Sequence, residues 1–65
     1  MKYVIITKVD GIVYYICFDE TYFVKADADD SIIAKFDTFQ QADAIAKRSS
    51  SDTVKYEVKP FDFNK

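Results

Sequence analysis

Apolar residues occupy almost every position from Ile12 to Phe18, so a β-strand formed by this stretch would be apolar on both faces. A strand of this kind has to be covered on both sides. The preceding stretch, Lys2 to Val9, is rich in β-branched and aromatic residues. Asp10-Gly11, which joins the two stretches, tolerates the positive φ angles of a tight type I′ turn. The pattern therefore predicts a β-hairpin over residues 2–18.

The two-residue turn sets which hairpin residues share a face. The pairs expected on one face are Val9 with Ile12, Thr7 with Tyr14, Ile5 with Ile16, and Tyr3 with Phe18. The opposite face then carries a second apolar set, formed by Val4, Ile6, Val13, Tyr15 and Cys17. Both faces of the predicted hairpin are thus mainly apolar.

The middle of the chain has a weaker pattern. Residues 19–30 contain the apolar triplet Tyr22-Phe23-Val24 between acidic residues, and we interpret them as an irregular connection. The stretch from Ser31 to Phe36 fits a short third strand, while a helical turn that starts after Asp30 or Ser31 competes with it. The sequence leaves both alternatives open.

A helix is predicted to begin at Phe39. Thr38 and Gln41 have the spacing of a capping box, in which the threonine oxygen accepts a hydrogen bond from a backbone N–H of the first turn. The apolar residues that recur at helical spacing are Phe39, Ala42, Ile45 and Ala46. The polar run from Ser49 to Asp52 ends the helix.

A last strand is expected from Thr53 to Lys59, because apolar and polar residues alternate there. Pro60 has no N–H to donate to a ladder, so it should end the pairing and leave residues 60–65 as a flexible tail. The whole chain of 65 residues is expected to be one small domain. The predicted fold class is α+β: an antiparallel sheet of three to four strands with one helix packed on one face.

One short helix rich in alanine can cover only one face of such a sheet. We assign the helix to the face of Ile5 and Ile16, which leaves the other face exposed, and the sequence leaves the reverse assignment open. An uncovered apolar face of this size typically marks an interface. The residues predicted to form a protein interface are Val4, Ile6, Val13, Tyr15 and Cys17. The partner would be a second copy, giving a homodimer, or a different protein.

Composition argues against several kinds of chemistry. The chain has no His and a single Cys, so it lacks the commonest general base, an internal disulfide and a zinc site. We therefore expect no enzymatic activity, no cofactor, and a cytoplasmic location with no targeting segment. The net charge of -2 argues against binding to nucleic acid or an anionic membrane.

A metal site is not expected either. Asp27, Asp29 and Ser31 have the spacing of the first three ligands of a calcium-binding EF-hand loop. However, Ile32 and Thr38 stand where that loop needs Gly and Glu. We interpret this segment as a solvated acidic turn.

Acidic residues cluster between positions 19 and 30, where Lys25 is the single basic residue. The residues of this acidic contact surface are Asp19, Glu20, Asp27, Asp29 and Asp30. An acidic mimic of nucleic acid, or a small nucleic-acid-linked regulator, is therefore an alternative function.

Two segments, MKYVIITKVDGIVYYI and AKFDTFQQADAIAK, resemble small proteins encoded by bacteriophages and prophages. The resemblance rests on the hairpin and on Ala34, Phe36, Thr38 and Ala42 around the helix entry, all structural in kind. It implies a non-enzymatic protein that binds and inhibits a host or defence protein. The sequence thus favours a protein-binding module, with anti-defence or host-modulating inhibition as its expected role.

Overall fold

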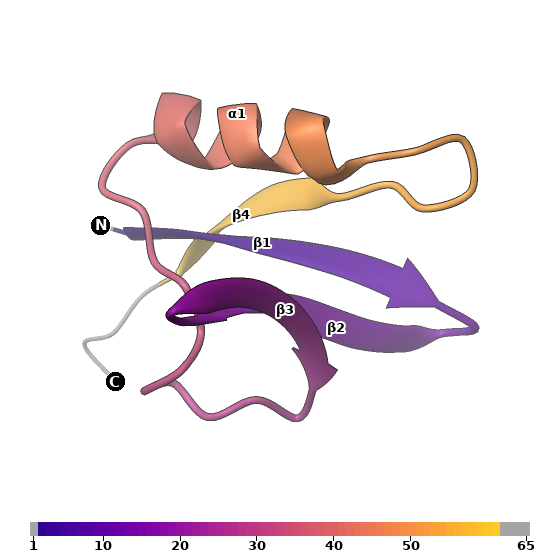
Figure 1. Cartoon of the computed structure of the whole chain (residues 1–65), viewed down its shortest axis with the longest axis horizontal. Helices are drawn as coiled ribbons and strands as arrows, with labels where there is room; N and C mark the ends of the chain where they lie inside the picture. The colour runs from indigo at the N-terminus through magenta and orange to yellow at the C-terminus, as the bar shows by residue number, and fades with distance from the viewer. Residues whose placement is uncertain (1, 62–65) are drawn as a thin grey trace.

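The structure, a computed structural model, describes residues 2–61 and is built on a four-stranded antiparallel sheet. Its elements are β1 (Lys2–Val9), β2 (Ile12–Asp19), β3 (Thr21–Ala26), α1 (Phe39–Ser49) and β4 (Glu57–Phe61). The strands lie in the order β3-β2-β1-β4, and α1 crosses one face over β1 and β4 (Figure 1). The predicted α+β class is confirmed.

The turn of the first hairpin forms as predicted. Asp10 and Gly11 have φ angles of 53° and 80°, as a type I′ turn requires. Thr7 lies opposite Tyr14 and Val9 opposite Ile12, which is the predicted register.

The hairpin opens farther from its turn, where the pairing of β1 with β2 stops at Ile6 and Tyr15. A segment formed by residues 32–36, the inserted segment, lies between the two strands there. Tyr3 and Phe36 exchange two backbone hydrogen bonds of 2.9 Å. On the side of β2, the N–H of Phe18 donates to the carbonyl of Ile32 at 2.9 Å, and the N–H of Ala34 donates to the carbonyl of Ile16 at 3.0 Å. The predicted pairs of Ile5 with Ile16 and of Tyr3 with Phe18 are therefore wrong.

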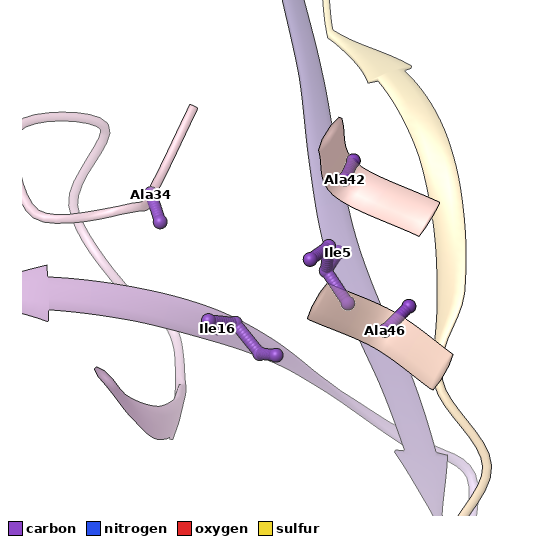
Figure 2. Close-up of a cluster of buried hydrophobic side chains, with 5 residues drawn as sticks. All are labelled: Ile5, Ile16, Ala34, Ala42 and Ala46. Atoms are coloured by element: carbon purple, nitrogen blue, oxygen red, sulfur yellow. The ribbon is translucent and has the colours of Figure 1, made fainter. Parts of the chain in front are cut away.

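The inserted segment adds to the core on both faces of the sheet. Ala34 joins the cluster under the helix, which consists of Ile5, Ile16, Ala34, Ala42 and Ala46 (Figure 2). On the opposite face, Ile33 packs with Val4, Ile6 and Cys17, and all of these residues are buried. The expectation that the chain can cover only one face is therefore wrong, because a loop segment covers the second face.

Residues 31–36 combine parts of both alternatives that the sequence left open. The N–H groups of Ile32 and Ile33 donate to the carbonyl of Asp29 at 3.1 and 3.2 Å, which closes a turn. Ile33 and Phe36 then make isolated bridges to Cys17 and Tyr3. Residues 31–36 thus form a turn followed by single bridges, and they do not form a regular strand.

The helix begins at Phe39, as predicted, and the backbone N–H of Gln41 donates to Thr38 Oγ1 at 3.1 Å. At the other end, Ser50 Oγ donates to the carbonyl of Ala46 at 2.8 Å and accepts from the N–H of Tyr56 at 3.1 Å. One hydroxyl group therefore both caps the helix and holds the chain that leads into β4. The small side chains of Ala42 and Ala46 let α1 lie close over Ile5 (Figure 2).

The last strand starts and ends later than predicted. Thr7 Oγ1 donates to the carbonyl of Lys55 at 2.7 Å, and Tyr56 is bound to Ser50, so these residues are held outside the ladder. Pro60 lies inside β4, opposite Tyr3. The backbone groups of Tyr3 point toward Phe36, which makes this a pair without hydrogen bonds to β4. The nitrogen of Pro60 therefore faces the outer edge of the sheet, where no donor is needed.

The prediction that Pro60 ends the pairing is consequently wrong, and Phe61 still pairs with Lys2. The remainder of the predicted tail, residues 62–65, lies outside the described residues.

The connection predicted for residues 21–26 is also wrong, because they form β3 and pair with β2 along their whole length. The turn into β3 uses Glu20, a non-glycine residue with a φ of 85°. Turns with positive φ are usually signalled by Gly or Asn, so this one left no signal in the sequence.

We expect Ile33→Ala to lower the free energy of unfolding by about 2–4 kcal/mol, because it removes a buried side chain from the second face of the core. Ile12→Ala is the matched control, since Ile12 is 49% exposed and its truncation should cost less than about 1 kcal/mol. Urea denaturation followed by circular dichroism measures both values. Equal losses for the two variants would contradict the role given to Ile33.

Candidate functional site

The residues predicted as a protein interface lie inside the folded chain. Val4, Ile6 and Cys17 are buried, and Val13 and Tyr15 are half-buried beside them. Ile33, Ile32, Ala28 and Phe61 pack against this set. The structure therefore brings the five residues together on the sheet face opposite the helix, where the inserted segment covers them.

Cys17, the single thiol of the chain, is fully buried between the sheet and Ile33. Burial raises the pKa of the thiol, an effect that Lys25 reduces in part. Its Sγ lies 3.6 Å from the carbonyl of Tyr15. A thiol that is both buried and protonated at neutral pH is a poor nucleophile.

We expect Cys17 in the folded protein to react with a thiol reagent at least about a hundred times more slowly than in urea. The reason is that modification requires the inserted segment to move away from the sheet. The rate at which an aromatic disulfide reagent releases its coloured thiolate measures the rate of Cys17 modification. Equally fast modification of the folded chain would show that the second face is open.

β3 is one of the two edge strands of the sheet. The even-numbered residues Ile16 and Phe18 of β2 direct their backbone groups toward the inserted segment, so Tyr15 and Cys17 bond toward β3. Their partners on β3 are Lys25 and Phe23. The alternation of an antiparallel ladder then points the N–H and C=O groups of Tyr22 and Val24 outward. Within residues 2–61, no other strand pairs with this edge.

Exposed apolar side chains accompany this edge. Phe18, Tyr22 and Val24, which we call the β3 surface, are 51%, 50% and 47% exposed. They project from the face that carries α1, but the helix lies over β1 and β4 and leaves them uncovered (Figure 1). The rings of Phe18 and Tyr22 lie 5.0 Å apart, and Tyr22 stacks on Phe36 at 6.4 Å. The rings of Phe18, Tyr22 and Phe36 thus pack against one another.

Two concavities lie between the β3 surface and the helix. One, of 230 Å³, is lined by Ile16, Tyr22, Phe23, Val24, Ser49 and Tyr56. The other, of 480 Å³, is lined by Tyr22, Lys35, Phe36, Asp37, Gln41 and Ile45. Asp37 is paired with Lys2, which lowers the pKa of the Asp37 carboxyl. Tyr22 borders both concavities and therefore stands at the centre of the candidate site.

The acidic residues are exposed, and three of them flank β3. Asp19 and Glu20 come just before the strand, and Asp27 follows it in a turn with a φ of 56°. Asp29 and Asp30 lie farther along the connection, where their carbonyls accept hydrogen bonds from Ile33 and Lys35. In the described part of the chain, no group of three or more acidic, Cys or His side chains is placed to hold a metal ion.

The β3 surface was not among the predicted site residues, although the sequence carries a signal for it. Thr21, Tyr22, Phe23 and Val24 are all residues that favour strands. No Gly, Asn or Pro stands directly before the triplet Tyr22-Phe23-Val24, so the turn that leads into β3 has no signal in the sequence. The five acidic residues are exposed, but the division of three of them between the two ends of a strand depends on β3.

We expect amide hydrogen exchange along β3 to alternate. The amides of Phe23 and Lys25 bond toward β2 and should be protected, while those of Tyr22 and Val24 should exchange with little protection. Residue-resolved exchange measured by NMR tests this pattern. Protection of all four amides in a dilute sample would mean that the edge is already paired.

No protein-family model matches the chain, and no curated protein or solved structure matches it either. No helix within residues 2–61 is long and apolar enough to span a membrane.

Proposed function

We propose that the protein is a non-enzymatic protein-binding module that binds its partner by strand addition at β3. The observation that carries this proposal is the coincidence of an unpaired backbone edge with exposed apolar side chains. Tyr22 and Val24 carry outward N–H and C=O groups, and their side chains, with that of Phe18, form the β3 surface. Strand addition uses both parts, because backbone bonds give affinity and side chains give specificity.

The contrast between the two edges of the sheet supports this proposal. β4 carries Pro60 at an outward position, and Glu57 and Lys59 stand on the same strand. Proline and charged residues are the usual means of protecting an edge from pairing. β3 has no proline, and Lys25 is its single charged residue. The chain therefore protects one edge and leaves the other ready to pair.

Inhibition of a host or defence protein is the biological role that we propose for this binding. It is supported by the resemblance of the hairpin and helix entry to small phage-encoded proteins. The buried thiol of Cys17 supports binding over nucleophilic chemistry. The exposed acids support contact with a protein more than imitation of nucleic acid, because β3 and its apolar side chains separate Asp19 and Glu20 from Asp27.

The test uses Val24→Pro, which gives β3 the protection that Pro60 gives β4. The N–H of Val24 points away from β2, so the substitution removes an outward donor and leaves the ladder to β2 intact. Val24→Thr is the matched control, since it keeps the N–H and the branched shape. Immobilised chains would be exposed to a bacterial lysate, and the retained proteins identified by mass spectrometry.

We expect the original chain and Val24→Thr to retain the same protein, and Val24→Pro to lose at least about 90% of it. Circular dichroism should show that all three chains are folded. Retention of that protein by folded Val24→Pro would contradict binding at the β3 edge. Light scattering during size-exclusion chromatography would show in parallel whether a second copy occupies the edge.

A further inference from the structure

We infer that the segment bound at β3 is an extended stretch of another protein, apolar at alternate positions and basic at both ends. This inference rests on the proposed function and adds the chemistry of the partner. It follows from three features of the β3 edge: its backbone groups, its side chains, and the charges that flank it.

The backbone groups require an extended occupant. Outward N–H and C=O groups of Tyr22 and Val24 alternate along the edge at the spacing of a β-strand. A helix satisfies its own backbone groups and has none to offer to a sheet edge. The partner must therefore present a strand whose own donors and acceptors are still free.

The side chains require apolar residues on one face of that strand. Tyr22 and Val24 project on the helix side, next to the concavity that Ile16 and Tyr56 help to line. Phe23 and Lys25 project on the opposite side. A strand paired with β3 continues both faces, so every second residue would pack beside Tyr22 and Val24. Those residues should be apolar, while the residues between them can be polar.

The charges require basic residues at the ends of the strand. Asp19 and Glu20 lie at one end of β3 and Asp27 at the other, and all three are exposed. Within residues 2–61 none of them forms an ion pair. Lys or Arg at both ends of a bound strand would meet these carboxylates in either direction of pairing.

The same charges disfavour a second copy as the occupant. Antiparallel pairing of two β3 strands would bring Asp19 and Glu20 of one copy to the end of the other copy that carries Asp27. The repulsion would occur at both ends of the interface, and Lys25 is the one basic residue of each strand. A basic segment from another protein would be attracted at the two ends of β3 where a second copy would be repelled.

The test selects peptides without assuming their sequence. A displayed library of random peptides of about twelve residues would be selected on the original chain and depleted on Val24→Pro. We expect the enriched peptides to alternate apolar and polar residues and to carry Lys or Arg at both ends. The best peptide would then be synthesised, together with a version in which its terminal basic residues are replaced by Gln.

We expect the peptide with Gln at its ends to bind the original chain about tenfold more weakly at low salt. The basic peptide should bind the double variant Glu20→Gln, Asp27→Asn more weakly by a similar factor. Asp52→Asn is the matched control, because it removes an exposed acid from the loop between α1 and β4 and should leave affinity unchanged. Fluorescence anisotropy at about 0.05 and about 0.5 M salt measures the dissociation constants of the peptides. The difference in affinity between the basic and the neutral peptide should shrink at high salt.

The contrary results separate the inference from the proposed function. Enrichment of neutral or acidic ends, or equal affinity of both peptides, would overturn the charge requirement while binding at β3 stands. The absence of enrichment over Val24→Pro would overturn both. A dimer of the original chain that Val24→Pro converts to a monomer would overturn the inference and identify the second copy as the occupant.

Discussion

The insertion of residues 32–36 between β1 and β2 is the interaction on which the rest of the structure depends. Where the hairpin opens, backbone groups of Tyr3, Ile16 and Phe18 lose their cross-strand partners, and the inserted segment replaces those partners. Buried backbone groups without hydrogen bonds are costly, so four backbone hydrogen bonds between the inserted segment and these strands stabilise the opening. The same residues place Ile33 on one face and Ala34 on the other, and lead directly into the helix cap at Thr38.

The covered second face changes what a chain of 65 residues can achieve. A small domain usually has one core layer and buries a modest share of its surface. Here a short loop with Ile32 and Ile33 serves as a third layer without a second helix. On the other face the cover is less complete, because the single helix contacts only β1 and β4. The β3 surface belongs to the apolar part of the sheet that the helix leaves uncovered.

Local signals made part of this fold predictable from the sequence. Asp10-Gly11 determined the first turn, and Thr38 determined the start of the helix, because each acts through neighbouring backbone atoms. Features that depend on distant contacts were not predictable. The opening of the hairpin needs Phe36 to reach Tyr3, and the tolerance of Pro60 within β4 follows from that same contact. The candidate site was missed for a local reason, since Glu20 adopts a positive φ that residues of its type seldom show.

Pro60 also has a consequence for the size of the assemblies that this protein can form. A sheet with two open edges can join head to tail, with β3 of each copy on β4 of the next, and such contacts grow without limit into filaments. Pro60 removes a donor from the outer side of β4, which disfavours this growth. Under the proposed strand addition at β3, a chain that pairs through β3 alone would form complexes of fixed stoichiometry. In that proposal, Pro60 lets β3 stay open for a partner without making the protein prone to filament formation.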